Sequence, residues 1–333
     1  MEHTLPSYNI WKGCVFLTKK ILTMIFIYII LAMIGLPALI TYCSYSSHSP
    51  AEPETAQPEA ELASPEIIRT SELENYIKGV VAAEMPALFE IEALKAQAVS
   101  ARTYAVRKMK ENNSNAVPYD IGQAYLSIEQ MQQKWGENFT TYYNKISEAV
   151  DSTRGEIMTY ENEPILAVFH AESAGKTEAA ENVWTQEIPY LKSVDSSLDK
   201  NAPDFETSIS FTYDECIKRF SNQYGNLSLS KDTLPQQLKI LSHTPAGYVQ
   251  QIQVGNKILT GREVRETLHL RSSNFSIQTQ NDMVIFTTKG YGHGAGMSQY
   301  GAEFMAREGK SYQQILQHYY TGISFSVYDS KET

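Results

Sequence analysis

The chain is poor in cysteine and tryptophan, with three of each among its 333 residues. Three cysteines are too few for a disulfide framework or for a zinc site built from four cysteines. The formal net charge of −10 argues against nucleic acid as the main partner, because binding phosphates requires a basic surface. Hydrophobic residues make up 42% of the chain, which is ample for a folded domain with its own core.

Charged residues are also missing between Ile21 and Cys43, where the sequence is predominantly apolar. This run is longer than the ~20 residues that a helix needs to span a bilayer. Three lysines precede it, and no Lys or Arg occurs in residues 44–68. The positive-inside rule therefore places residues 1–20 in the cytoplasm and the remainder outside. We predict a transmembrane signal anchor at residues 21–43. A cleaved signal peptide is the alternative, although its apolar core would be shorter.

Residues 44–68 contain four prolines and five glutamates without a single Lys or Arg. Such a composition buries little apolar surface and is typical of a flexible tether. The remaining part, residues 69–330, is predicted to be one α+β domain in which a helical N-terminal part packs on a mixed or antiparallel sheet. Helices are expected over residues 71–85, 90–111, 138–153, 213–223, 261–268, 297–307 and 311–319, and strands over 156–160, 165–169, 246–253, 256–260, 274–279 and 283–288.

The first of these helices carries the most informative acid. The pair Ser71 and Glu74 has the spacing of a capping box, and Pro86 predicts the end of the helix. Val81 and Glu84 share one helix face, so the Glu84 carboxyl lies in line with apolar side chains. Burial raises the pKa of a carboxyl and keeps a general acid protonated near neutral pH. The pattern leaves two roles open for Glu84, namely a catalytic acid and a glutamate that turns outward at the helix end.

Arg102 lies in the small-residue segment AQAVSARTYAV of the second helix. A guanidinium among small residues needs an anion or a carbonyl as its partner. The pattern leaves two roles open for Arg102, namely binding a substrate and forming a structural ion pair.

Two histidines follow strands and precede glycine-containing loops. His170 with Ser173 has the residue types of a base and a nucleophile, but the G-x-S-x-G elbow of a serine hydrolase is absent. His170 and Ser173 are therefore predicted to contact the substrate rather than to act as nucleophile and base. His170 and His293 could approach one another, yet neither has a further ligand at metal-binding spacing, so no metal is predicted.

Residues 290–301 contain five glycines, which allow the backbone to approach a ligand closely. His293, Ser298, Gln299 and Tyr300 would supply the donors, acceptors and ring that a sugar site needs. A purely structural glycine loop is the alternative.

Several segments, in order, resemble the stage II sporulation protein D family, and the resemblance covers most of residues 69–327. The segments are Val80–Pro86, Glu92–Ala105, Phe169–Thr177, Val183–Trp184, Pro189–Val194 and Gly290–Ala302. The resemblance implies a lytic transglycosylase of the septal space. It would cleave the N-acetylmuramic acid to N-acetylglucosamine bond of peptide-stripped peptidoglycan during forespore engulfment, leaving 1,6-anhydro ends.

The resemblance also implies roles for particular residues and partners. The family's catalytic glutamate corresponds to Glu84, its second-helix arginine to Arg102, and a Tyr-x-Lys pair beside the groove to Tyr190 and Lys192. Implied partners are glycan strands, a SpoIIP-like amidase, a SpoIIM-like membrane scaffold and the cytoplasmic membrane. Some members bind zinc near the His170 loop, but Ser173 and the absence of cysteine there predict no cofactor. A glycan-binding activator of an amidase, or a structural tether, is the alternative function.

Overall fold

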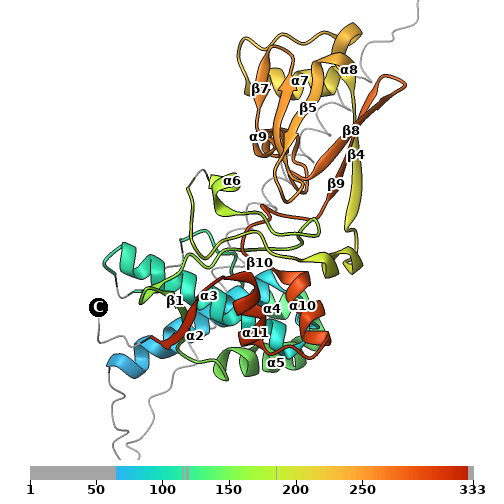
Figure 1. Ribbon diagram of the computed structural model, residues 1–333. Coiled ribbons are helices and arrows are strands. Elements are labelled where there is room, and N and C mark those ends of the chain that lie inside the picture. Colours follow the sequence, from blue (N-terminus) through green and yellow to red (C-terminus); the bar gives the residue numbers. More distant parts are fainter. Residues whose placement is uncertain (1–64, 115, 118–119, 185, 329–333) are drawn as a thin grey trace, which may run out of the picture. The chain divides into compact units, whose positions relative to one another are not determined.

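The computed structural model describes residues 65–114, 116–117, 120–184 and 186–328 (Figure 1). The predicted cytoplasmic segment 1–20 and anchor 21–43 lie outside the described residues. Of the predicted tether, only residues 65–68 are described, and they form the first turn of a helix that begins at Pro65. No helix in the described part of the chain is long and apolar enough to cross a membrane.

The described residues belong to one compact unit and alternate between helices and short strands. The helices are α2 (Pro65–Glu84), α3 (Ile91–Glu111), α4 (Ile128–Trp135), α5 (Phe139–Asp151), α6 (Ala180–Trp184), α7 (Tyr213–Gln223), α8 (Leu234–Gln237), α9 (Gly261–Leu268), α10 (Gln299–Arg307) and α11 (Tyr312–Tyr319). The strands are β1 (Glu156–Tyr160), β2 (Glu163–Pro164), β3 (Phe169–His170), β4 (Glu206–Thr212), β5 (Leu238–His243), β6 (Val249–Val254), β7 (Lys257–Leu259), β8 (Phe275–Gln280), β9 (Met283–Lys289), β10 (Met297–Ser298) and β11 (Ser324–Val327).

The described strands form four small sheets rather than one large one. Three are antiparallel, with strand orders β11-β1-β2, β4-β9-β8 and β5-β6-β7, and the pair β10-β3 is parallel. We call residues 206–289, from β4 to β9, the sheet lobe, and the other described residues the helical lobe. Figure 1 shows the helical lobe gathered around α2, α3 and α5 and the sheet lobe beyond β10.

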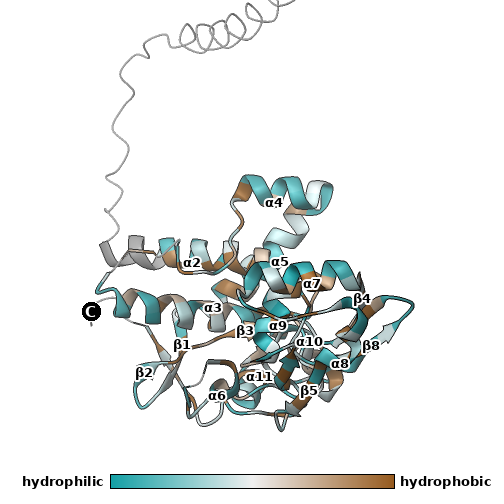
Figure 2. Cartoon of the chain, turned by 90° about the horizontal axis from the view of Figure 1, so that it is seen from above, coloured by the Kyte–Doolittle hydropathy of each residue, from teal (hydrophilic) through white to brown (hydrophobic). Residues whose placement is uncertain are grey.

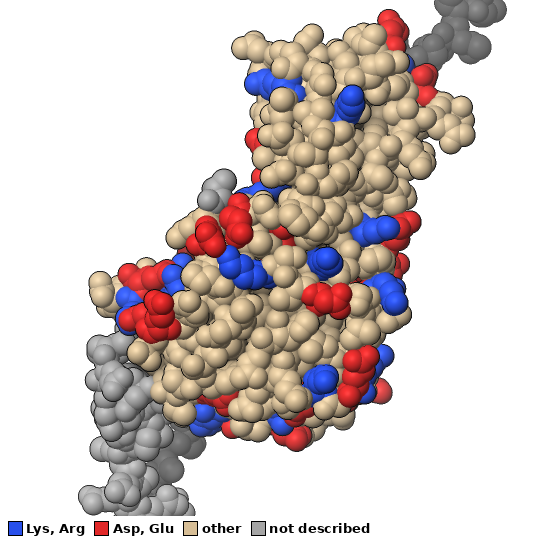
Figure 3. All heavy atoms as spheres, viewed as in Figure 1, with Lys and Arg blue, Asp and Glu red and all other residues tan. Residues whose placement is uncertain are grey.

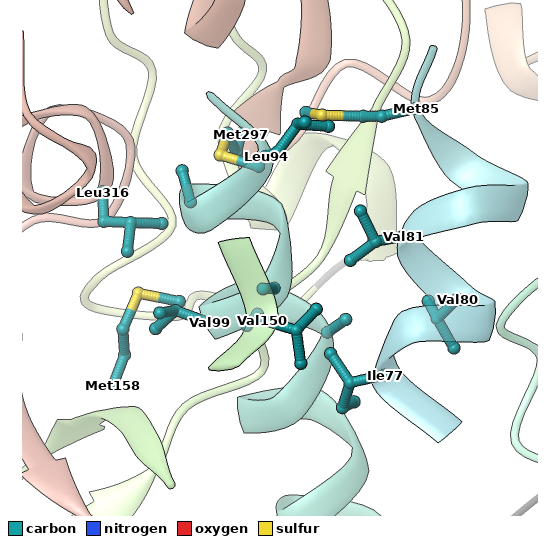
Figure 4. Close-up of a cluster of buried hydrophobic side chains, with 14 of the residues drawn as sticks. Ile77, Val80, Val81, Met85, Leu94, Val99, Val150, Met158, Met297 and Leu316 are labelled. Carbon is teal, nitrogen blue, oxygen red and sulfur yellow. The ribbon is translucent and has the colours of Figure 1, made fainter. Parts of the chain in front are cut away.

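The core of the helical lobe forms around α3, which lies beside α2 (Figure 2). Most residues of α3 are buried, because its many alanines let neighbouring helices approach it from several sides. Val81 of α2, Leu94 of α3 and Met158 of β1 meet in this core together with Met297 and Leu316 (Figure 4). Segments far apart in the sequence thereby hold the end of α2 in place.

The sheet lobe has a separate core. Phe220 of α7 and Val264 of α9 pack with Ile252 and Phe286 from its two sheets. On the face drawn in Figure 3, acidic and basic side chains are interspersed rather than segregated by sign. This arrangement is typical of an ordinary soluble surface.

The α+β class predicted from the sequence is confirmed, and every predicted helix is present. The predicted capping box is wrong: Ser71 lies inside α2, which begins at Pro65, and Glu74 is buried. The end at Pro86 is confirmed, because α2 stops at Glu84. The predicted strand 165–169 is mostly wrong, since only Phe169 within it pairs as a strand.

Candidate functional site

Glu84 is the last residue of α2 and is half-buried. Its Oε1 accepts a hydrogen bond of 3.2 Å from the backbone N–H of Ala124, and its carboxyl is also hydrogen-bonded to the side chain of Gln299. Burial raises the pKa of Glu84 above its usual value, and the two hydrogen bonds oppose that increase. The carboxyl is therefore held in one orientation and is protonated at higher pH than an exposed glutamate.

The Glu84 carboxyl opens into a pocket of about 270 Å³, which we call the Glu84 pocket. Both lobes contribute to it, so it is formed only in the complete fold. Its lining consists of Glu84, Pro86, Phe89, Ala171, Glu172, Pro203, Asp204, Arg271, Tyr291, Gln299 and Tyr300. A carboxyl in a concave site with aromatic rings, amides and one guanidinium fits a sugar better than a flat apolar ligand.

Three residues of the glycine segment 290–301 line this pocket, namely Tyr291, Gln299 and Tyr300. Gln299 is buried beside Glu84, and the Tyr300 ring packs edge-on against Phe89 with centroids 5.1 Å apart. The glycines themselves have a structural role: a Cβ at Gly290 would lie 2.7 Å from the carbonyl oxygen of Glu172. The loop therefore packs on the chain that follows β3, and α10, which starts directly after it, presents Gln299 and Tyr300 to the pocket.

Glu84 is not the only acid in the pocket. Glu172, which is 2% exposed, and the exposed Asp204 line it as well. Burial raises the pKa of Glu172, and the guanidinium of Arg271 lowers it. Glu172, Asp204 and Arg271 are not among the site residues predicted from the sequence. The available signal was that Glu172 directly follows a strand, in the segment that already contained His170.

Ser298 and Ser173 lie beneath the pocket and cannot touch a ligand, because both are fully buried. The Ser298 hydroxyl donates to Asp199 Oδ2 at 2.7 Å, and the Ser173 N–H donates to the same atom at 2.6 Å. Ser298 also caps the N-terminus of α10. The structure thus places neither of these predicted substrate contacts in the Glu84 pocket, and the two serines belong to the network beside Gln299 and Tyr300.

Asp199 is the buried acceptor of this network, and burial raises its pKa to about 7 from an ordinary 3.8. A carboxyl with a raised folded-state pKa stabilises the fold while it is protonated, and this stabilisation is lost as the pH rises from about 4 to about 7.

The substitution Asp199→Asn keeps a hydrogen-bond acceptor without the charge. We expect the variant to lose less thermal stability than the unmodified protein between about pH 5 and about pH 8, measured by circular dichroism. An equal loss in both proteins would contradict this assignment.

His170 and Ser173 form a hydrogen-bonded pair, with Nε2 and Oγ 2.7 Å apart. His170 Nδ1 lies 3.0 Å from the carbonyl of Ala295 and must donate to it, so Nε2 accepts from the serine. Burial lowers the pKa of His170 to about 3, which keeps the ring neutral. His170 is 4% exposed and lies outside the Glu84 pocket, so the structure does not bring this predicted substrate contact together with Glu84.

His293 also lies away from Glu84. Its ring packs against those of His170 and Trp184, at centroid distances of 5.6 and 5.2 Å, and burial lowers its pKa to about 4. It lines a second pocket of about 380 Å³, which also contains Arg262 and Arg265. His293, which was predicted to bind substrate, thus lines a different cavity from the Glu84 pocket.

Arg102 forms a buried ion pair. Its Nε and Nη2 donate to the two oxygens of Glu74 at 2.9 and 2.7 Å, and Nη2 also donates to the carbonyl of Val150. Both side chains are at most 1% exposed. Of the two roles that the sequence left open for Arg102, the structure shows the structural ion pair, and Arg102 does not line the Glu84 pocket.

Comparisons with known proteins identify the family of this chain. A family model described as SpoIID, stage II sporulation protein, matches residues 63–160, which include Glu84. The stage II sporulation protein D of Bacillus subtilis is 43% identical over 265 residues, covering 78% of this chain and 75% of that protein. Its counterpart from Bacillus amyloliquefaciens is also 43% identical, with the same coverage.

The chain belongs to the stage II sporulation protein D family. A more distant relative is the amidase enhancer of Bacillus subtilis, 29% identical over 76% of this chain and 40% of that protein. Family membership supports a role in sporulation and indicates a protein that acts on the cell wall.

The Tyr-x-Lys pair implied by the family resemblance lies outside the Glu84 pocket. Tyr190 is 7% exposed, and its hydroxyl accepts from the N–H of Leu166 at 2.9 Å. Lys192 is partly exposed and forms an ion pair of 2.7 Å with Glu187. Tyr190 is thus part of the fold, and Lys192 is paired at the surface.

A metal site is not formed by the residues described. No group of three or more His, Cys, Asp or Glu side chains within them could hold a metal ion. Cys216, the cysteine within the described residues, is buried in the core of the sheet lobe.

Proposed function

We propose that this protein is a lytic transglycosylase that cleaves N-acetylmuramic acid to N-acetylglucosamine bonds in peptide-stripped peptidoglycan strands during engulfment. The observation that carries the proposal is the Glu84 carboxyl, oriented by Ala124 and Gln299, with a raised pKa, in a pocket that both lobes form. Relatives named stage II sporulation protein D support the cellular context.

In the proposed reaction Glu84 acts twice. Its protonated carboxyl gives a proton to the glycosidic oxygen while the bond from that oxygen to C1 of muramic acid breaks. The resulting carboxylate takes the proton of the C6 hydroxyl, whose oxygen bonds to C1 and closes the 1,6-anhydro ring. The carboxyl is thereby regenerated, and no water is consumed. A glycosidase that uses water would instead need a second carboxylate acting as a base or nucleophile.

The reaction requires protonated Glu84 at the first step, so kcat/KM should fall as the pH rises through its pKa. The hydrogen bond from Gln299 lowers that pKa. We therefore expect Gln299→Leu to raise the pKa of Glu84 and to move the alkaline limb of the kcat/KM profile to higher pH. A profile that stays in place, or moves to lower pH, would contradict the role of Gln299 in setting this pKa.

The proposed activity is tested with glycan strands freed of their peptides. The full-length protein, purified in a mild detergent because residues 21–43 are apolar, is incubated with the strands, and the new ends are analysed by mass spectrometry. We expect anhydro-muramic acid ends that accumulate with time. Intact strands after prolonged incubation would contradict the proposal.

A second function is favoured by the amidase enhancer relative, namely stimulation of a peptidoglycan amidase that strips the strands. The two functions are separable, because stimulation of an amidase would not require proton exchange at Glu84. We also propose that residues 21–43 anchor the protein in the cytoplasmic membrane, with residues 69–330 on the outer side. A SpoIIP-like amidase and a SpoIIM-like scaffold would be its partners there.

A further inference from the structure

The wall of the Glu84 pocket contributed by the sheet lobe contains an arginine that is incompletely paired. Arg271 lies between α9 and β8, and its backbone carbonyl accepts from Gly292 N–H at 3.0 Å, which ties it to the glycine loop. Its guanidinium carbon lies 4.6 Å from the centroid of the exposed Tyr291 ring. The side chain is 30% exposed and therefore open to the pocket.

The contact of Arg271 with Glu172 uses only part of the hydrogen-bonding capacity of either group. Arg271 Nη2 and Glu172 Oε1 are 3.4 Å apart, longer than the ~2.7–2.9 Å of a close charged hydrogen bond. Glu172 Oε2 and Arg271 Nε are buried and have no hydrogen-bond partner among the described residues. A guanidinium has five N–H donors, so spare donors and a spare acceptor meet on one wall. A ligand that contacts the exposed part of the guanidinium would use N–H donors that Glu172 leaves free.

Charge restricts where an anionic ligand can sit in this pocket. Arg271 is the sole cationic residue among the described side chains that line it, whereas Glu84, Glu172 and Asp204 are acidic. The three acids repel an anionic group. The guanidinium of Arg271, whose charge is only partly offset by its 3.4 Å contact with Glu172, is the group of this described lining that attracts one.

The substrate of the proposed function alternates between two sugars, and only N-acetylmuramic acid carries a lactyl carboxyl. This group is a neutral amide while the stem peptide is attached and becomes a carboxylate when the peptide has been removed. Guanidinium and carboxylate groups are complementary in charge and in geometry.

We propose that Arg271 binds the lactyl carboxylate of a peptide-free N-acetylmuramic acid residue, and that this contact sets the register of the strand against Glu84. The inference rests on the proposed function for the identity of its ligand. It makes Arg271 a specificity-determining residue that distinguishes stripped strands from strands that still carry peptides.

The test measures binding, so that it does not depend on turnover. All proteins carry Glu84→Gln, and two ligands are compared by calorimetry: peptide-free strands, and the same strands with their carboxylates converted to methylamides. We expect the free carboxylate strands to bind about 10- to 100-fold more tightly, because charged hydrogen bonds are replaced by weaker neutral ones. Adding Arg271→Gln should reduce this ratio to about one.

Arg219→Gln is the matched control, because Arg219 is an exposed arginine of the sheet lobe that does not line the pocket. It should leave the ratio unchanged. Arg271→Gln could misfold because Glu172 would lose its cation. In that case the double variant Glu172→Gln, Arg271→Gln, which buries no unpaired charge, is used in place of the single variant.

The inference is overturned if the parent protein binds both ligands equally, or neither, or if a folded Arg271 variant retains the preference for carboxylate. Failure of the proposed function is a different result, namely that the protein with Glu84 intact leaves both ligands uncleaved. In that case the binding ratio still decides whether Arg271 recognises the carboxylate.

Discussion

Glu84→Gln is expected to lower the rate of anhydro-end formation by about 10²- to 10⁴-fold, the usual contribution of a general acid or base. The carboxamide has nearly the size of the carboxyl, and its oxygen can still accept from the N–H of Ala124. It cannot release or take up the proton that both proposed steps need. The fold and the affinity for peptide-free strands should therefore be retained, and the loss should appear in kcat.

The control for this variant is Glu72→Gln, because Glu72 lies on the same helix and is exposed. It should have the rate of the unmodified protein within about twofold. A Glu84→Gln protein that is folded and still forms anhydro ends at a normal rate would exclude Glu84 as the proton donor. If that protein also stimulated an amidase normally, the amidase-activating function would be favoured.

Arg102→Met is expected to lower the free energy of unfolding by about 3–5 kcal/mol, because it leaves the Glu74 carboxylate buried without its cation. Glu74 would retain only the hydrogen bond of 3.0 Å from the N–H of Gly155. The double variant Glu74→Gln, Arg102→Met removes both charges and should recover part of the loss. Denaturant titration of the three proteins measures the effect.

A surface ion pair on the same helix provides the comparison. Lys110 pairs with Glu163, and their side chains are 50% and 63% exposed, so Lys110→Met should change the stability by less than about 1 kcal/mol. The KM of folded Arg102→Met should remain unchanged, since Arg102 is fully buried. An increase in KM with unchanged stability would restore the substrate-binding role that the sequence had suggested.

The sequence was sufficient where local patterns determine structure. Periodicity placed the helices, and Pro86 located the end of α2 and with it the position of Glu84. The Ser71 and Glu74 pattern failed because the same spacing occurs inside helices. The true partner of Glu74 is Arg102, which is 28 residues away in the sequence, and no local pattern contains that pairing.

The candidate site was predicted only in part, because it combines segments distant in sequence. Gln299 and Tyr300 were found since they lie in a conspicuous glycine segment, but Glu172 and Arg271, 99 residues apart, gave no common signal. The opposite error occurred at His170 and Ser173, whose residue types suggested chemistry while their burial excludes contact with a ligand. Burial of single residues in a loop depends on tertiary packing and is not visible in periodicity.

The central proposal is that one carboxyl assists the C6 hydroxyl of muramic acid in attacking C1 of the same sugar. It is tested most directly by cleavage in water enriched in a heavy isotope of oxygen. The presence of Glu172 and Asp204 beside Glu84 makes this measurement necessary, because two carboxylates could also support hydrolysis. We predict that mass spectrometry will find 1,6-anhydro ends without any oxygen from the solvent. Reducing ends that carry the heavy isotope would contradict the account and identify the protein as a hydrolase.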